Sequence, residues 1–438
     1  MKRVLCLGAG LVARPYIQYL SDNDFHVIVA SRTISKAEHL IEGCKNAEAL
    51  AFNMAKDDDL LENLTQNSDL VCSLLPFIFH VKAAKVAIRN KTHFCTTSYI
   101  SDEMKNLDTD ARKAKILILN ECGVDPGIDH MSAMKIIDEV HKNNGKIESF
   151  TSFTGGLPAP DANNNPYGYK LSWSPRGVLL AGRNDAHFLL KGKKVKIPGP
   201  ELFENCELME IPGIGTFEGY PNRDSLSYIN IYNIPETKTM LRGTLRNVGW
   251  CSTLDKIADL GLLDLGERSF DGMTYADLMR ELTSTSDSDV KSSVANTCNV
   301  ESSNPIIKRL EWLGLFEEKQ IPSGINTILD ALCNLFEEKL QYAPGERDMI
   351  IMHHEFLVQY PNKKQRITST LIDYGIPNGD SSMSRTVALP VAIASKMILD
   401  EKITLTGVHR PIVPEIYEPI LKELETLDIK MDEKTFDL

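Results

Sequence analysis

A glycine turn near the start of the chain constrains the fold more than any other feature of the sequence. Residues 4–7 read Val-Leu-Cys-Leu, a short apolar run that stops at Gly8, and an amphipathic segment follows Ala13. Such a run predicts a buried parallel strand, and the segment after it predicts a helix. Gly8, Gly10 and Ala13 form a G-x-G-x-x-A pattern between strand and helix, which is the context that a dinucleotide-binding turn requires.

Each residue of this pattern has its own physical role. Gly8 permits the tight turn, Gly10 lets the backbone approach a pyrophosphate, and Ala13 keeps the helix close to the sheet. The N–H groups and the dipole of the helix then hold the anion. The turn therefore predicts a bound dinucleotide, and Leu11 and Val12 are included among its predicted contacts.

The end of the second predicted strand, residues 25–30, indicates which dinucleotide. An NAD-selective fold usually places Asp or Glu there to bind the ribose 2′-hydroxyl. This chain has Ser31, Arg32 and Thr33 instead, with no acid. Because a guanidinium can form a charge-assisted pair with a 2′-phosphate, the sequence favours NADP over NAD. The alternative is that Arg32 is only a solvated residue at a helix start.

Strands and helices continue to alternate through the first third of the chain. Further strands are predicted at residues 69–75, 93–97 and 115–120, with helices at 82–89 and 101–114 between them. This alternation predicts a doubly wound parallel sheet with its site at the carboxyl ends of the strands. The predicted cofactor contacts beyond the residues already named are Asn53, Met54, Leu75, Thr97, Ser98, Val124, Asp125, Pro126 and Ser174.

Composition excludes several other classes of protein. A net charge of −12 argues against nucleic acid, since binding a phosphate backbone needs a basic face. No apolar run approaches the roughly 18 residues that a membrane helix needs. The nine cysteines form no CxxC pair, and the adjacent His353 and His354 have no cysteine nearby, so no metal site is predicted. The apolar start of the chain is interrupted by Arg14 and Pro15, and a cytoplasmic protein is expected.

The alternating pattern stops after residue 127. A predicted 24-residue loop at 154–177 contains Tyr167, Tyr169 and Trp173, which are residue types that proteins bury. Loops of that length are usually functional segments or lids, which weakens the alternative of an idle insertion. The other elements predicted beyond residue 127 are helices at 128–143 and 383–399, strands at 147–153, 239–246, 348–358 and 365–374, and a helical region at 249–342.

Several segments together make the chain recognisable. They are GAGLVARP, SLLPFIFH, TTSYIS, NECGVDPGIDHM, GGLPAPDANNNPYGYKLSWSPRGVL, EGYPNRDS and LRGTLR, in this order from residue 8 to residue 246. With them the sequence resembles the saccharopine dehydrogenase family of the glutamate-forming type. That family joins glutamate to 2-aminoadipate 6-semialdehyde and reduces the imine to saccharopine with a nicotinamide cofactor. The resemblance implies an NADP-dependent oxidoreductase of lysine metabolism that forms a homodimer.

The resemblance also implies a division of the chain. A Rossmann-type NADP-binding domain is expected over residues 1–124 and 391–438. A mixed α/β substrate-binding and dimerisation domain is expected over residues 125–248 and 343–390. A small helical domain is expected over residues 249–342. The fold class is therefore α/β, with a doubly wound parallel sheet, a mixed domain and a helical insert.

Guanidinium groups and hydroxyls are the side chains that a substrate with several carboxylates needs. Arg223 and Arg246 are the best candidate carboxylate clamps and are supported by the resemblance, which also includes Thr244. Either arginine could instead belong to a surface ion pair. Arg176 is a further candidate. The resemblance places substrate contacts at Ser98 as well.

Tyr99 and Asp125 are the predicted catalytic residues and are also predicted to contact substrate. Both follow strand ends, so they can reach nicotinamide and substrate, where they would handle a proton or stabilise an iminium ion. His130 is expected to be a capping or packing residue. The family pattern has a cysteine where this chain has Thr154, so a required thiol acid at that position is doubtful.

Two other interpretations are compatible with the cofactor motif. One is a reductive condensation with a different amine donor, as in polyamine-forming relatives. The other is an NADP-binding sensor without turnover, against which the arginines and hydroxyls argue. A short-chain reductase is not supported, because Tyr99 is not followed by the lysine of a YxxxK pair.

Overall fold

In the computed structural model, which describes residues 1–286 and 288–438, the glycine turn joins the central strand of a parallel sheet to a helix. Seven parallel strands form the sheet in the order β15-β6-β5-β4-β1-β2-β3. The order reverses at β1, which creates the crevice where such folds bind ligands. The strands are β1 (Arg3–Leu7), β2 (His26–Ser31), β3 (Ala47–Ala51), β4 (Leu70–Ser73), β5 (His93–Thr96), β6 (Leu117–Leu119) and β15 (Gly407–His409).

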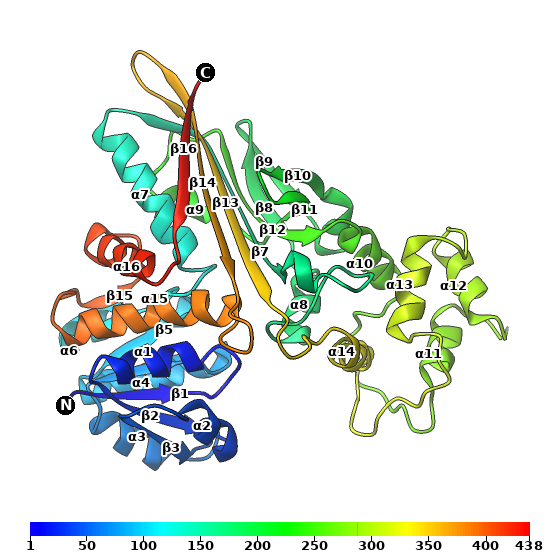
Figure 1. Ribbon diagram of the computed structural model, residues 1–438, viewed down its shortest axis with the longest axis horizontal. Coiled ribbons are helices and arrows are strands. Elements are labelled where there is room, and N and C mark those ends of the chain that lie inside the picture. The colour runs from blue at the N-terminus through cyan, green and yellow to red at the C-terminus, as the bar shows by residue number, and fades with distance from the viewer. Residues whose placement is uncertain (287) are drawn as a thin grey trace. The chain divides into compact units, whose positions relative to one another are not determined.

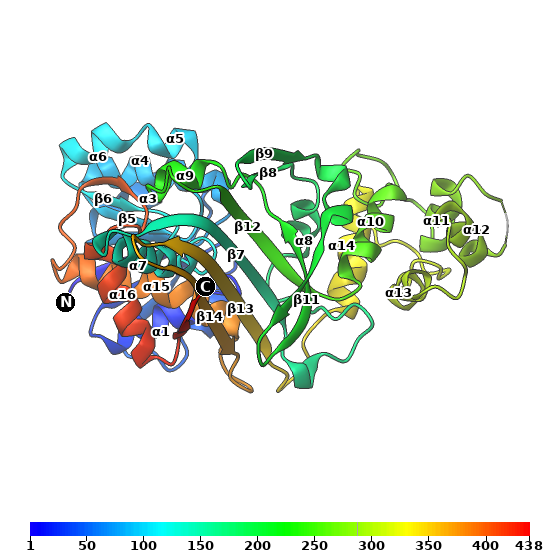
Figure 2. The ribbon, with the colours of Figure 1, turned by 90° about the horizontal axis from the view of Figure 1, so that it is seen from above.

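Helices cover both faces of this sheet (Figures 1 and 2). Side chains of α3, α4 and α6 pack with Leu5 and Leu7 of β1 on one face. On the other face α1 packs against α15, which also contacts β4 and β5. The helices of this part are α1 (Arg14–Asp22), α2 (Ile34–Leu40), α3 (Asp58–Gln66), η1 (Phe77–Phe79), α4 (His80–Asn90), α5 (Asp102–Lys105), α6 (Asp108–Ala114), α7 (Ile128–Lys142), α15 (Ser382–Leu399) and α16 (Pro414–Thr426).

A row of three buried cysteines crosses the sheet on the face covered by α1 and α15. Cys6 of β1 is in register with Cys72 of β4, which is in register with Cys95 of β5. Tyr16 of α1 lies against this row, and its hydroxyl shares a hydrogen bond of 3.1 Å with Ser395 of α15. Burial raises the pKa of the Cys6 and Cys95 thiols to about 12, so these thiols are packing groups.

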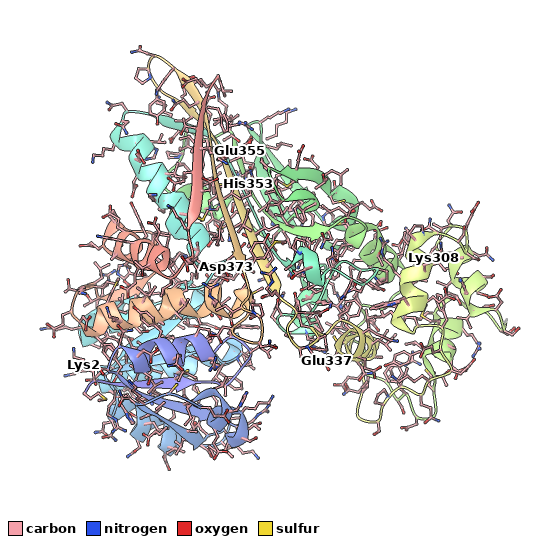
Figure 3. The ribbon with its side chains drawn as sticks, in the orientation of Figure 1. Lys2, Lys308, Glu337, His353, Glu355 and Asp373 are labelled. Atoms are coloured by element: carbon pink, nitrogen blue, oxygen red, sulfur yellow. The ribbon has the colours of Figure 1, made fainter. Side chains whose placement is uncertain are left out.

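Two further strands, β14 (Lys364–Tyr374) and β16 (Met431–Asp437), pair antiparallel. Asp373, labelled in Figure 3, lies on β14 and is buried. Its carboxylate accepts a 2.8 Å hydrogen bond from Arg385 Nη1 and a 2.6 Å hydrogen bond from Ser382 Oγ. Both partners lie in the first turn of α15, so this ion pair fastens the helix to the strand.

The chain divides into two units, residues 1–146 with 359–438 and residues 147–358. The second unit is built on strands in the order β10-β11-β12-β7-β13; β8 pairs with β12, and β9 pairs with β8. The three-domain division predicted from the sequence stays a prediction. The strands of this unit are β7 (Lys146–Pro158), β8 (Ala186–Leu190), β9 (Lys193–Ile197), β10 (Glu207–Ile211), β11 (Gly215–Pro221), β12 (Thr239–Asn247) and β13 (Asp348–Gln359).

The helices α10 to α14 cover about half of residues 249–342, where the sequence predicts a helical region. Tyr275, fully buried on α11, donates a 3.2 Å hydrogen bond to the Ala331 carbonyl of α14. The helices of the unit are η2 (Pro160–Ala162), α8 (Pro175–Ala181), η3 (Gly199–Glu201), η4 (Phe203–Asn205), α9 (Ser227–Ile231), α10 (Trp250–Asp259), α11 (Tyr275–Leu282), α12 (Val290–Thr297), α13 (Pro305–Leu313) and α14 (Ile328–Lys339).

The predicted α/β fold with a doubly wound parallel sheet is confirmed, and several local predictions are corrected. The predicted loop at 154–177 begins inside β7, which continues to Pro158, and it ends inside α8. The predicted helix at 101–114 is two helices, α5 and α6. Among the described residues no helix is both long and apolar enough to cross a membrane.

Candidate active site

The backbone of the glycine turn leaves room for a ligand on one side only. Gly8 has φ +112°, and a Cβ added to it would lie 3.1 Å from the carbonyl carbon and oxygen of Leu74. A Cβ added to the exposed Gly10 would meet nothing within 4 Å. Ala13 is fully buried directly before α1. The close approach of strands at Gly8 and the open backbone at Gly10 fit a pyrophosphate at the N-terminus of α1.

The end of β2 presents a cation to the same edge of the sheet. Arg32 is exposed and forms no ion pair with the described residues. Ser31 Oγ accepts a 3.3 Å hydrogen bond from the Thr33 N–H, which orders the turn that carries Arg32. This geometry fits a cofactor with a 2′-phosphate. Asn53 follows β3, where its N–H donates a 2.7 Å hydrogen bond to Asp57.

Tyr99 and Asp125, the two predicted catalytic residues, are in contact. The Tyr99 hydroxyl donates a 3.2 Å hydrogen bond to Asp125 Oδ1. Tyr99 is 36% exposed and Asp125 is half-buried, so both groups can meet a substrate. They follow β5 and β6, two neighbouring parallel strands, which explains why residues 26 positions apart in the chain come together.

Sequence reasoning missed His80, which lies behind Ser98. Its Nε2 is 2.8 Å from Ser98 Oγ and its Nδ1 is 2.9 Å from Ser73 Oγ. Burial lowers the pKa of His80 to about 4, so the ring is neutral at pH 7. His80 therefore orients the Ser98 hydroxyl through a neutral hydrogen bond. His80 could have been identified from its position, because it is the first residue of α4 and follows β4 at the carboxyl edge of the sheet.

The turn that carries Val124, Asp125 and Pro126 can form only with glycine at its end. Gly127 has φ +150°, and a Cβ added to it would lie 2.0 Å from the Gly123 carbonyl oxygen. The Gly127 N–H donates a 2.5 Å hydrogen bond to Asp129 Oδ1. The turn is therefore held tightly on both sides of Asp125.

A buried charge network lies next to this turn. Glu121 is 1% exposed and accepts hydrogen bonds of 2.9 Å from His130, Arg410 and the Ile100 N–H. Burial raises the pKa of Glu121, but the hydrogen bond and charge of His130 and the charge of Arg410 outweigh it and lower the pKa overall. Glu121 is therefore ionised, and it links β6, α7 and the segment after β15. His130 lies in this network at full burial.

In the second unit, strand alternation places Arg242, Thr244 and Arg246 on one face of β12. Arg246 is 5% exposed, and its guanidinium carbon lies 5.1 Å from the ring centre of Tyr169 and 5.6 Å from that of Trp250. Nη1 donates to the Leu245 carbonyl, and Nε has no partner. Within the described ranges Arg246 forms no ion pair.

The remaining predicted residues of this unit are more exposed. Arg223 follows β11 with φ +52°, which is unusual for a residue with a side chain, and its carbonyl accepts a 2.8 Å hydrogen bond from the His187 N–H. Ser174 is exposed and caps α8. Arg176 forms an ion pair with Asp330, so its guanidinium already has a carboxylate partner.

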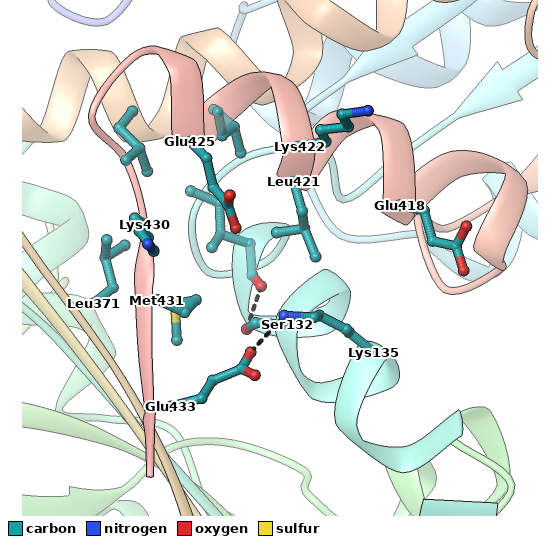
Figure 4. Close-up of a pocket in the computed structure, with 13 residues that line it drawn as sticks. Ser132, Lys135, Leu371, Glu418, Leu421, Lys422, Glu425, Lys430, Met431 and Glu433 are labelled. Carbon is teal, nitrogen blue, oxygen red and sulfur yellow. Dashed lines mark hydrogen bonds and ion pairs between the residues drawn. The ribbon is translucent and has the colours of Figure 1, made fainter. Parts of the chain in front are cut away.

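The first unit contains a cavity of about 330 Å³. It is lined by α7, α16 and the start of β16, as Figure 4 shows, and it holds the ion pair of Lys135 and Glu433. None of the predicted site residues lines it. Its wall combines apolar side chains with charged ones, among them Glu418, Glu425 and Glu433.

Two family models match this chain. Residues 4–119 match the model of the saccharopine dehydrogenase NADP binding domain, and residues 123–429 match that of the saccharopine dehydrogenase C-terminal domain. The saccharopine dehydrogenase [NADP(+), L-glutamate-forming] of Schizosaccharomyces pombe is 42% identical, with all of both chains covered.

Solved structures agree at the level of the fold. The apo saccharopine dehydrogenase (L-Glu forming) of Saccharomyces cerevisiae has a TM-score of 0.91 at 38% identity, again over all of both chains. The homospermidine synthase of Legionella pneumophila has a TM-score of 0.60 at 10% identity, over 100% of this chain and 92% of that one, a likeness of fold alone. The full-length matches show that the chain belongs to the saccharopine dehydrogenase family.

Proposed function

We propose that this chain catalyses the NADP(H)-dependent condensation of L-glutamate with 2-aminoadipate 6-semialdehyde to saccharopine, and the reverse oxidation. Membership of the saccharopine dehydrogenase family supports this activity, since the full-length relatives are named for it. The structural observation that carries the proposal is the state of Arg246, a buried cation that forms no ion pair with the described residues.

Burying a guanidinium without an anion is costly, because the charge loses its hydration. Tyr169 and Trp250 offset part of this cost through their ring faces, but ring faces cannot satisfy the planar N–H donors of the arginine. A substrate carboxylate would accept from these donors in a bidentate pair. Saccharopine and glutamate both carry such groups, whereas a polyamine has none and would leave Arg246 unpaired.

Tyr99 and Asp125 are proposed to handle the proton on the substrate nitrogen. NADPH supplies the hydride that reduces the imine carbon when it is bound. Asp125 can accept a proton or stabilise a protonated nitrogen, and the hydrogen bond from Tyr99 holds its carboxylate in one orientation. The hydroxyl of Ser98, fixed by His80, is proposed to orient the substrate beside them.

Two further properties are proposed, the oligomeric state and the compartment. The family resemblance supports a homodimer. All nine cysteines are free, which supports a reducing compartment such as the cytoplasm.

The direct test is a spectrophotometric assay of saccharopine oxidation, run separately with NADP and with NAD. Saccharopine-dependent reduction of NADP is expected. Tight NADPH binding without any saccharopine-dependent change in nicotinamide absorbance would instead support a sensor. Slow turnover of saccharopine beside fast turnover of a different secondary amine would support a different condensation.

The carboxylate role is tested by replacing Arg246 or Arg223 with Ala. Each charge-assisted pair contributes roughly 1.5–3 kcal/mol, so the Michaelis constant for saccharopine is expected to rise about 10- to 150-fold. The turnover number is expected to change less, because the same carboxylates are held before and during hydride transfer. Lys at either position should rescue only in part, since it lacks the planar fork.

Arg176→Ala is the matched control, because Arg176 already pairs with Asp330. It should leave the Michaelis constant for saccharopine unchanged. A collapse of turnover at a constant Michaelis constant in the Arg246 or Arg223 variants would contradict the binding role.

A further inference from the structure

Two cysteines and a glutamate from three separate elements of the second unit converge at one point. Cys206 directly precedes β10, Glu218 lies on β11, and Cys251 lies in the first turn of α10. Their two sulfur atoms and one carboxylate oxygen all lie within 4.8 Å of one another. Sequence spacing gives no hint of this cluster, because the three residues lie on different elements and no two are within ten positions.

We propose that Cys206, Glu218 and Cys251 form a binding site for a thiophilic divalent cation of the zinc type, which ties β11 and the start of β10 to α10. Two thiolates and one carboxylate are ligands that zinc accepts, and water would complete the tetrahedron. Zinc–sulfur bonds of about 2.3 Å place two ligand sulfurs about 3.8 Å apart, so the cluster needs only small movements to close on the ion.

The carboxylate is already oriented as a ligand. Glu218 is 7% exposed, and its two oxygens accept hydrogen bonds of 2.8 Å from the Gly249 N–H and 2.7 Å from the Cys251 N–H. Within the described ranges no cationic side chain pairs with it. Backbone donors of this kind fix a metal-binding carboxylate in place while leaving lone pairs for the ion.

The two thiols supply ligands for a cation, and one of them can be reached from solvent. Cys251 is fully buried, whereas Cys206 is half-buried and gives solvent access. Burial and the charge of Glu218 raise the pKa of both thiols, so without a cation they keep their protons. A bound divalent ion would replace those protons and neutralise the carboxylate at once.

Cobalt(II) serves as the spectroscopic probe in the full-length protein. One equivalent per chain is expected to produce thiolate-to-cobalt charge-transfer absorption and the intense visible bands of a tetrahedral site. Cys206→Ser and Cys251→Ser should each weaken binding by roughly 100-fold or more, since even an outer-shell partner is typically worth 10–100-fold. Cys44→Ser is the matched control, a half-buried cysteine in the other unit that should leave the titration unchanged.

A second measurement needs no variant. Iodoacetamide should modify Cys206 in the wild-type protein slowly, because its thiol is half-buried and protonated. Zinc should slow that reaction further while magnesium should not; peptide mapping identifies the residue. The labelling of Cys44 should be the same with and without zinc. The absence of charge-transfer bands, labelling of Cys206 that zinc does not change, or a Cys206–Cys251 disulfide in the purified protein would each overturn the proposal. None of these readouts depends on catalytic activity.

Discussion

The side chain of Arg32, at the end of β2, is expected to decide whether the protein prefers NADP or NAD. Its exposed guanidinium is free to pair with the 2′-phosphate of NADP, a group that NAD lacks. Arg32→Ala should therefore raise the Michaelis constant for NADP by roughly 10- to 150-fold, the value of one charge-assisted pair, while leaving that for NAD nearly unchanged. Lys36→Ala, an exposed cation on the next helix, is the control. Equal losses with both cofactors would contradict the role.

His80 makes the stability of the fold sensitive to mild acid. Its folded pKa of about 4 lies below the ordinary value of 6.5, so between these pH values the unfolded chain binds more protons than the folded one. The free energy of unfolding should fall by about 2 kcal/mol from pH 7 to pH 5 through this residue alone. In urea titrations at the two pH values, His80→Gln should remove that part of the loss. Identical pH dependence in the wild type and His80→Gln would show that His80 is not the titrating group.

The predicted cofactor-binding residues could be chosen from the sequence because the ends of buried strands are easy to recognise. Gly8, Arg32 and Asp125 each follow an apolar run, and a parallel sheet brings such ends to one edge. His80 could not be found in this way, because its role depends on the burial of its ring between Ser73 and Ser98. The Cys206 cluster was missed for the same reason, since only the packing of α10 over β11 assembles it.

Among the elements, the contact of α15 with β14 depends on one buried charge pair. Asp373→Asn would leave Arg385 without its carboxylate, and removing one partner of a buried pair costs roughly 3–5 kcal/mol. The variant should unfold at a clearly lower urea concentration. Glu62→Gln breaks the exposed pair of Glu62 with Arg89 and should cost at most about 1 kcal/mol. Equal midpoints for the two variants would contradict this account.

Long elements with a clear hydrophobic period were predictable, and short or polar ones were not. The predicted helix at 383–399 is α15 almost to the residue, because its length and apolar character leave no competing structure. The strand β3, with no fully buried residue, was missed. Residues 431–437 form β16 although most of their side chains are exposed, because their backbone pairs with β14.

At the scale of the whole molecule, a homodimer stays a prediction of the family resemblance. Sedimentation at micromolar concentration should give about twice the chain mass of 48.9 kDa. A single species at the mass of one chain, unchanged on raising the protein concentration, would contradict it. The association is expected to involve residues after 126, where the sheets have edges that can pair.

The position of α15 late in the sequence affects how the parallel sheet folds during synthesis. This helix covers the face of the parallel sheet that carries Cys6, Cys72 and Cys95, yet it lies near the end of the sequence. At ribosomal rates of about 5–20 residues per second, Ser382 is synthesised roughly 10–50 s after Leu119. Through that interval α1 covers part of this face of the six strands already made, and the part that α15 will cover stays exposed. Chaperones that shield nascent chains are therefore expected to hold this protein until α15 has emerged from the ribosome.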